Sequence, residues 1–336
     1  MNTVTNTSEE RLLHVSASAH IRVTTTTADI MKDVIISMLP ACLFGIYQFG
    51  ISALIIILAT VISCVLTEYA FQKFLKKPIT IKDLSAVVTG IILALNMPPQ
   101  IPVWIPVLGG IFAILVVKQM YGGIGFNWMN PALAARCFLL ISFAGKMTNF
   151  SSKKMGYDSV TSATPLASMK SYLTALHSPN AEAVKPTYKL IDLFLGKIPG
   201  TIGEVSAVAL LIGVVYLLIR KTISLRIPIA YILTVAIFSF IFGIHSLDFV
   251  LYQVLGGGLI FGAFYMATDY TTTPITPKGQ IIFGICIGLL TGIFRLFGGS
   301  AEGVSYAIIL GNILTPLIEK ATIPVAFGKE KRHEKA

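Results

Sequence analysis

The chain has 336 residues, of which 54% are hydrophobic and only 12% are charged, and its formal net charge is +10. Soluble domains carry about 25% charged residues, and a soluble chain of this size could not keep so much apolar surface out of water. The composition therefore excludes an ordinary soluble protein. The basic residues lie in short loops rather than in a stripe with interleaved aromatics, so we expect no nucleic-acid partner.

The first 30 residues are polar and rich in threonine, without the apolar core of a signal peptide. Ten apolar segments follow, most of them near the roughly 20 residues that a membrane-spanning helix needs. The sequence thus predicts an all-α polytopic membrane protein with about ten transmembrane helices. Segments 84–97, 131–145 and 280–295 are short, which predicts broken or tilted helices. The ten segments are 33–49, 51–71, 84–97, 102–118, 131–145, 203–219, 227–243, 250–268, 280–295 and 303–320.

Lysine and arginine are distributed unevenly between the two sides of the membrane. With the amino terminus inside, the inside segments hold 17 basic residues and the four short outside loops hold only Arg295. This split predicts a multi-pass membrane protein with both termini in the cytoplasm. Residues 146–201 form a long hydrophilic loop on the outside, since long loops cross the membrane largely regardless of their charge.

The long loop divides the chain into two groups of five helices that resemble each other weakly. The fourth helix ends at Lys118 before Gly122 and Gly123, and the ninth ends at Arg295 before Gly298 and Gly299, on the opposite side. An odd number of helices in each half favours inverted repeats, as in many transporters, although these residues are common in loops. The predicted parts are an amino-terminal segment 1–32, a first half 33–145, the external loop 146–201, a second half 202–320 and a cytoplasmic tail 321–336.

Several residues allow a structural or a functional interpretation. Arg136 falls inside a short apolar segment, where a charge is either functional or reaches the inner surface by snorkelling. Asp269 precedes a threonine run and is expected to cap a turn, with a role in an ion path as the alternative. Asn130 and Pro131 are expected to begin a helix, and helix ends of this kind can also face an ion path. Gly256–Gly258 lie in an apolar segment that we expect to be helical, not in a dinucleotide fingerprint.

The four cysteines are far apart within apolar segments, at Cys42, Cys64, Cys137 and Cys286. We interpret them as small buried hydrophobic residues, so no metal site or iron–sulfur cluster is expected on this chain.

The external loop contains the run Asp158-Ser-Val-Thr161-Ser-Ala163-Thr164-Pro. From the residues alone, it is a polar turn before a proline. The pattern Asp-x-x-Thr-x-Ala-Thr, however, resembles the flavinylation motif of the family that joins RnfD, from Rnf-type ion-translocating oxidoreductases, to NqrB, from the sodium-pumping NADH:quinone reductase. His20-Ile-Arg22 and the entry to the first helix resemble the same family, and the chain length favours the RnfD branch.

The resemblance implies a protein of the bacterial cytoplasmic (inner) membrane in which Thr164 carries FMN through a phosphoester, installed outside that membrane by a flavin transferase. Asp158, Thr161 and Ala163 would complete the motif. It also implies a membrane complex with the other Rnf proteins (RnfA, RnfB, RnfC, RnfE and RnfG), in which electrons pass between ferredoxin and NAD with movement of Na⁺ or H⁺. Ferredoxin and NAD would be met by other subunits, and no catalytic residue is assigned here. A second, non-covalent flavin (riboflavin) occurs in this superfamily, but no motif in this chain specifies it.

Two other functions remain open from the sequence. One is the NqrB component of a sodium-pumping quinone reductase, which differs in the terminal acceptor. The other is a flavin-free secondary transporter or channel, which inverted repeats and broken helices would also suit.

Overall fold

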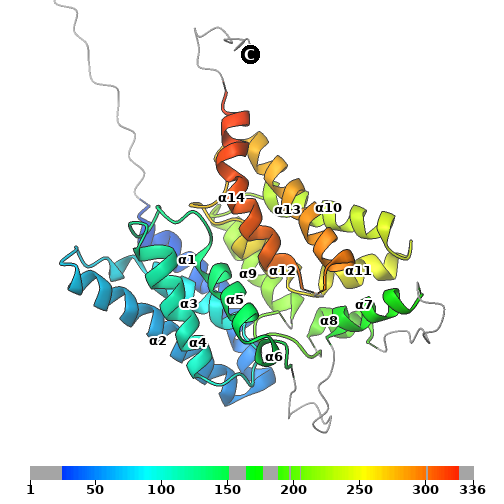
Figure 1. Cartoon of the computed structure of the whole chain (residues 1–336), viewed down its shortest axis with the longest axis horizontal. Coiled ribbons are helices and arrows are strands. Elements are labelled where there is room, and N and C mark those ends of the chain that lie inside the picture. Colours follow the sequence, from blue (N-terminus) through cyan, green and yellow to red (C-terminus); the bar gives the residue numbers. More distant parts are fainter. Residues whose placement is uncertain are drawn as a thin grey trace, which may run out of the picture.

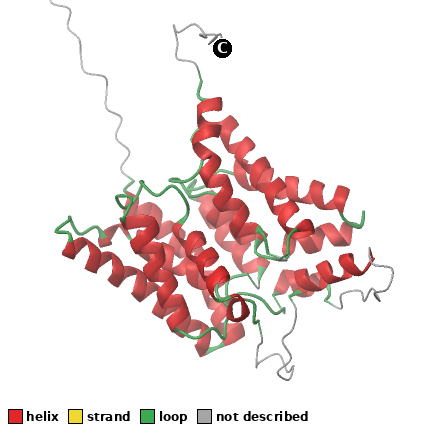
Figure 2. Cartoon of the chain, viewed as in Figure 1, coloured by secondary structure: helices red, strands yellow, loops and turns green. Residues whose placement is uncertain are grey.

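The computed structural model describes residues 25–150, 164–176, 188–196, 198–204, 206–299 and 302–324. Within these residues the chain consists of helices and loops, without a strand (Figure 2). The first half contains α1 (Thr27–Phe49), α2 (Ile51–Phe74), η1 (Ile81–Asp83), α3 (Ser85–Leu95), α4 (Trp104–Phe112), η2 (Ala113–Gln119), α5 (Pro131–Ser142) and α6 (Ala144–Met147). Then follow α7 (Pro165–Leu176), α8 (Leu190–Leu195), α9 (Ala207–Ile219), α10 (Arg226–Phe242), α11 (Leu247–Leu255), α12 (Leu259–Phe261), η4 (Gly262–Met266), α13 (Pro277–Phe297) and α14 (Val304–Thr322).

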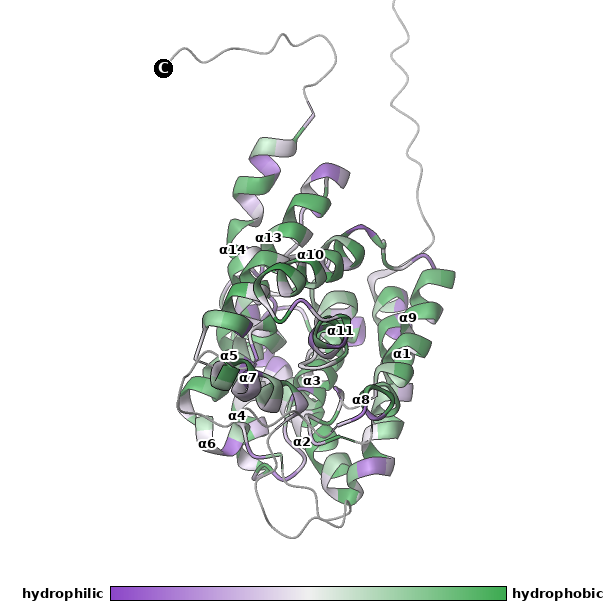
Figure 3. Cartoon of the chain, turned by 90° about the vertical axis from the view of Figure 1, so that its right-hand side faces the viewer, coloured by the Kyte–Doolittle hydropathy of each residue, from purple (hydrophilic) through white to green (hydrophobic). Residues whose placement is uncertain are grey.

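Each of the ten predicted apolar segments contains a helix of this set, and apolar residues cover much of the helical surface (Figure 3). By length and composition, α1, α2 and α13 can each cross a membrane, and α11 together with Leu259–Met266 forms a pair bent by 59° that passes the same test. The other apolar helices are shorter, as α3 and α5 were predicted to be. The all-α polytopic class is confirmed.

One length prediction is wrong. The segment 280–295 was expected to be short, but α13 has 21 residues. It begins earlier because the Thr276 side chain accepts a hydrogen bond from the Gly279 amide and Pro277 occupies the first turn, where its missing N–H costs nothing. The polar residues of this first turn resemble a loop when the sequence is read alone.

The two halves lie side by side, with α1–α5 on the left of Figure 1 and α10–α14 on the right. Two helix pairs join them, since α1 packs against α9 and α5 packs against α14. The assignment of the halves as inverted repeats, and of one end of the bundle to the cytoplasm, stays a prediction from the sequence.

The chain between the halves contributes two helices, α7 and α8, which pack against α11 (Figure 1). Their apolar side chains form a cluster of their own, in which Met169 and Leu173 of α7 and Leu193 of α8 meet Phe249 and Tyr252 of α11. This burial of apolar side chains fixes α7 against the membrane helices.

The structure corrects the expectation for the glycine run. Gly256–Gly258 were expected inside a continuous helix, but they separate α11 from α12. Gly257 and Gly258 have φ angles of +66° and +65°, which glycine adopts without steric cost because it has no Cβ. The run therefore ends α11 in the middle of an apolar segment and turns the chain towards α12.

Candidate functional site

Thr164 lies immediately before α7, and its backbone and side chain both take part in starting that helix. Its Oγ1 accepts a hydrogen bond of 3.2 Å from the Ala167 amide, and its carbonyl accepts one of 2.9 Å from the Ser168 amide. The threonine is thus the N-terminal cap of a 12-residue helix, and it is partly exposed. The other motif residues, Asp158, Thr161 and Ala163, lie outside the described residues.

Thr164 lines a small space that we call the outer pocket. Its walls come from the start of α7, the segment before α9, the glycine run after α11 and the segment that leads into α14. The space not occupied by atoms is about 330 Å³, part of it open to solvent. The lining residues are Thr164, Pro165, Leu166, Ile198, Pro199, Gly200, Glu204, Gly256, Gly257 and Glu302.

Arg295 holds the glycine wall of this pocket in place. Its guanidinium donates to the backbone carbonyls of Gln253, Gly256 and Gly257, the last two at 3.1 and 2.8 Å. Gln253 belongs to the last turn of α11, where carbonyls lack helical partners, and the two glycines follow that turn. Arg295 was counted with the short outside loops, but it lies in the last turn of α13 and is 2% exposed. Its Nε has no hydrogen-bond partner.

Arg136 of α5 joins the two halves behind the same pocket. It donates to the Asn96 side chain and, at 2.5 Å, to the carboxylate of Glu302. The side chain is only 6% exposed, and its Nε also lacks a partner. The snorkelling interpretation is wrong, because the guanidinium is buried against the chain segment that leads into α14. Removing one partner from such a pair leaves an uncompensated buried charge.

The sequence reasoning missed Glu204 and Glu302. Glu204 is half-buried and accepts a hydrogen bond of 3.0 Å from the Thr201 hydroxyl. Both glutamates lie at the start of an apolar segment, where each resembles a loop residue. The chain has arginines within its apolar segments, and a buried arginine needs an acidic partner. An acidic residue at the border of another apolar segment was therefore the signal that pointed to Glu204 and Glu302.

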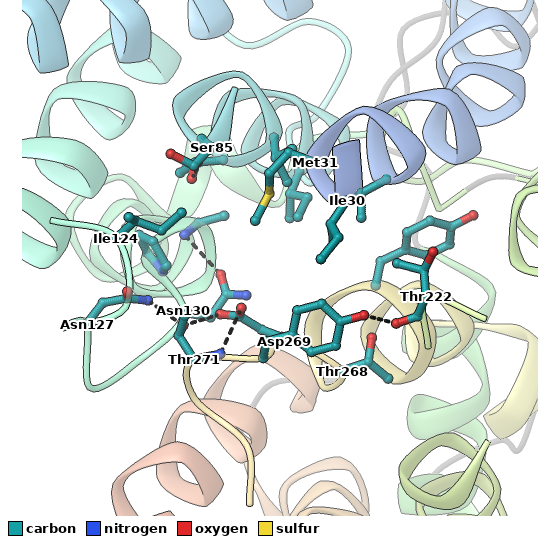
Figure 4. Close-up of a pocket in the computed structure, with 18 of the residues that line it drawn as sticks. Ile30, Met31, Ser85, Ile124, Asn127, Asn130, Thr222, Thr268, Asp269 and Thr271 are labelled. Carbon is teal, nitrogen blue, oxygen red and sulfur yellow. Dashed lines mark hydrogen bonds between the residues drawn. The ribbon is translucent and has the colours of Figure 1, made fainter. Parts of the chain in front are cut away.

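A second and larger space, which we call the inner cavity, lies where the predicted inside ends of several helices meet (Figure 4). The space not occupied by atoms is about 830 Å³, part of it open to solvent. Ile30 and Met31 of α1 form one apolar wall in this view, while Asn130, Asp269 and Thr271 supply polar atoms on the other side.

The polar side of the inner cavity is held by short-range hydrogen bonds. The Asn130 side chain accepts from the amides of Ala132 and Leu133 at 3.1 and 3.2 Å, which confirms the expected helix start. The Asp269 carboxylate accepts from the Thr271 hydroxyl at 3.1 Å, which confirms a turn cap. Both residues also line the cavity, so each can cap its turn or helix and still contact a molecule bound there.

Lys118, one of the residues that line the inner cavity, belongs to a buried ion pair. Lys118 is 3% exposed and donates to both carboxylate oxygens of Glu68, at 2.9 and 3.1 Å, and to the Ser85 hydroxyl at 2.6 Å. Gln119 donates to the same carboxylate at 2.7 Å. The sequence analysis counted Lys118 among the basic residues of the inside segments; in the structure its ammonium group is buried among these acceptors.

The cysteines show no sign of a site. Cys42, Cys64 and Cys137 are buried as predicted, while Cys286 is partly exposed. Among the residues that the structure describes, no three or more His, Cys, Asp or Glu side chains lie together so that they could hold a metal ion.

Comparison with known proteins extends these observations over almost the whole chain. A family model described as the NQR2, RnfD, RnfE family matches residues 14–328. The D subunit of the Na⁺-translocating ferredoxin:NAD⁺ oxidoreductase complex of Acetobacterium woodii is 49% identical over 326 residues, covering 96% of this chain and 98% of that protein. The D subunit of the proton-translocating ferredoxin:NAD⁺ oxidoreductase complex of Clostridium ljungdahlii is 41% identical, again covering 96% of this chain and 98% of the relative. The D subunit of the ion-translocating oxidoreductase complex of Actinobacillus succinogenes is 34% identical over 94% of this chain and 98% of its own length. On the match of both the family model and these full-length relatives, the chain belongs to the NQR2, RnfD, RnfE family.

Proposed function

We propose that this protein is the RnfD component of an ion-translocating ferredoxin:NAD⁺ oxidoreductase complex and carries electrons through FMN bound covalently to Thr164. The observation that carries the proposal is the position of Thr164: its hydroxyl begins α7 and lines the outer pocket. The names of the relatives support the complex, and the flavinylation motif supports the cofactor.

The residues at Thr164 fit a phosphoester. A phosphate on Oγ1 would lie at the amino end of α7, where free amides and the helix dipole favour a negative charge. Pro165 at the first helical position removes one amide that would otherwise lack a partner. The guanidinium groups of Arg136 and Arg295 lie behind the pocket and offset the two glutamates that line it, Glu204 and Glu302. Thr164 is partly exposed, so a flavin transferase can reach its hydroxyl before attachment.

When bound, FMN supplies the capacity to take and return one or two electrons, which side chains of this protein lack. The chain's own contribution is to hold the attachment point still. Met169 and Leu173 of α7 are buried against Phe249 and Tyr252 of α11. The tether is therefore anchored to a membrane helix, and the outer pocket beside it limits the positions available to the attached group.

The inner cavity supports a second part of the proposal, a non-covalent flavin such as riboflavin. The cavity is larger than the outer pocket and, like it, partly open to solvent. Apolar side chains form most of its wall, including Val88, Ile92 and Phe264, and a few polar groups such as Asn130 and Thr271 could orient a ring with donors and acceptors at one edge.

The proposal assigns ferredoxin and NAD⁺ to other subunits, because this chain carries no fingerprint for either. It places both termini in the cytoplasm and the Thr164 loop outside, following the distribution of basic residues. One relative is named for Na⁺ and another for protons, so the coupling ion differs within the family.

Replacement of Thr164 by alanine tests the proposal. In membrane vesicles holding the assembled complex, Thr164→Ala should abolish ferredoxin-to-NAD⁺ electron transfer and ion uptake together. Thr174→Ala is the matched control, since Thr174 lies on the same helix, is exposed and bonds to the Lys170 carbonyl. Ion uptake that survives loss of the flavin would replace the electron-carrier proposal with the transporter alternative. Electron delivery to quinone rather than NAD⁺ would favour the quinone reductase.

A further inference from the structure

Four charged side chains surround the outer pocket from four different parts of the chain. Glu204 and Glu302 line the pocket, and Arg136 and Arg295 lie directly behind them. We call these four residues the outer charge cluster. Their formal charges sum to zero, and both arginines are more than nine-tenths buried. A further charge placed near these four groups interacts with them strongly, because little water is present to screen the interaction.

The members of the cluster differ in how firmly their charges are fixed. Glu302 is held in an ion pair with Arg136. Arg295 is bound by three backbone carbonyls. Glu204, by contrast, has no ion pair within 4 Å among the described residues, and its hydrogen bond to a side chain comes from the neutral hydroxyl of Thr201. Its carboxylate is thus the least stabilised charge of the four.

The identity of the side chains then decides which one can change its charge. A guanidinium does not lose its proton in proteins, so Arg136 and Arg295 stay positive. Protonating Glu302 would leave Arg136 buried beside a neutral partner, which is costly. Glu204 can bind a proton without breaking an ion pair. Its protonated form can still accept the hydrogen bond from the Thr201 hydroxyl. The charged and titratable groups that face it are Glu302, Arg136 and Arg295.

We propose that Glu204 binds a proton when the group attached to Thr164 is reduced. The inference rests on the proposed function, since it requires a redox group at Thr164. One electron arrives from the subunit that feeds this one and adds one negative charge beside the cluster. The Glu204 carboxylate takes one proton from the outer aqueous phase and becomes a carboxylic acid, and it releases that proton when the electron leaves. Charge is conserved: an O–H bond of hydronium in the outer phase breaks as the carboxyl O–H bond forms, and the reverse occurs on release.

Glu204 lines the outer pocket, part of which is open to solvent, whereas the arginines lie behind it and are buried. Gly258 leaves room for the carboxylate, because a Cβ on this residue would lie 3.3 Å from the Glu204 carboxyl carbon. This subunit would then do more than pass electrons, since its outer face would take up and release protons in step with them.

Redox-induced infrared difference spectroscopy on the purified complex tests the inference directly. Reduction should produce a carboxylic-acid C=O band that shifts in D₂O. The band should vanish in Glu204→Gln and return at a changed position in Glu204→Asp. Thr201→Val should move the band and keep its intensity, since the variant removes only a hydrogen bond to that carboxyl group. Glu319→Gln is the matched control, because Glu319 is a partly buried glutamate that accepts a backbone hydrogen bond far along α14.

The two proposals fail in different ways. Covalent flavin at Thr164 is first quantified in every variant by in-gel fluorescence. Absence of flavin from the native protein refutes the proposed function. A second outcome is that flavin is present but the carboxylic-acid band on reduction is the same in Glu204→Gln and in the native protein. That outcome overturns the role of Glu204 and leaves the proposed function intact. If only Glu204→Gln loses the flavin, Glu204→Asp and Thr201→Val are used instead. A carboxylic-acid band that does not shift in these two variants would also overturn the role of Glu204.

Discussion

Substitution of Gly257 by alanine should destabilise the wall of the outer pocket far more than a comparable change elsewhere. A Cβ at this position would lie 2.6 Å from Arg295 Nη2 and closer still to Leu166 Cδ2. Gly257 also has a φ of +66°, a conformation that costs an L-residue roughly 1–2 kcal/mol. Arg295 cannot move aside freely, because its guanidinium holds the carbonyls of Gly256 and Gly257.

A second glycine, Gly125, separates the cost of the backbone conformation from the cost of the steric clash. Gly125 has a φ of +88° with nothing within 4 Å of its added Cβ, so Gly125→Ala carries only the backbone cost. Overpacking adds roughly 1–3 kcal/mol, so Gly257→Ala should lose about 2–5 kcal/mol and Gly125→Ala about 1–2 kcal/mol. At about 2 °C per kcal/mol for a chain of this size, the two losses correspond to falls of about 4–10 °C and about 2–4 °C.

The assay is the temperature at which half of the protein aggregates when the detergent-solubilised complex is heated, followed by immunoblotting of a tag on this chain. Equal shifts for Gly257→Ala and Gly125→Ala would refute the reasoning that Arg295 and Leu166 leave no room at the glycine turn. A Gly257→Ala protein that kept full covalent flavin and native stability would also show that Arg295 does not hold this wall.

Three further perturbations test other parts of the structure. Val88→Phe should fill the inner cavity, so that flavin extracted by denaturation falls while covalent flavin fluorescence is retained. Glu68→Leu or Lys118→Met alone should lower stability by about 3–5 kcal/mol in the same heating assay, and the double variant should recover most of that loss, since replacing both charges removes the unpaired one. Burial lowers the pKa of Lys170 on α7. The folded state then binds fewer protons than the unfolded state between that pKa and about 10.4, so protection of α7 amides from hydrogen exchange should rise with pH over this window, and Lys170→Met should remove the rise.

The sequence was informative about the elements because bilayer spans need long apolar runs. Each of the ten segments contains a helix, and the caps at Asn130 and Asp269 were recognised from their side chains. The start of α13 was misplaced, because capping by Thr276 extends a helix into residues that resemble a polar loop.

The candidate site was only partly predictable. The motif located Thr164, yet its role as the cap of α7 depends on helix geometry that the run of polar residues does not reveal. Glycines in an apolar segment are compatible with a helix, and only the contacts with Arg295 explain why Gly256–Gly258 break it. Glu204 and Glu302 come together only through tertiary packing, because they belong to segments that are far apart in the chain.

Mass spectrometry of the peptide that contains Thr164 tests the central claim most directly. In protein made by a host that has the flavin transferase, this peptide should carry the added mass of FMN less one water, and fragmentation should place it on Thr164. The addition should be absent from Thr164→Ala and present in Ser162→Ala. An unmodified peptide from the native protein, or the same addition on the Thr164→Ala peptide, would contradict the assignment of this chain as a flavin carrier attached at Thr164.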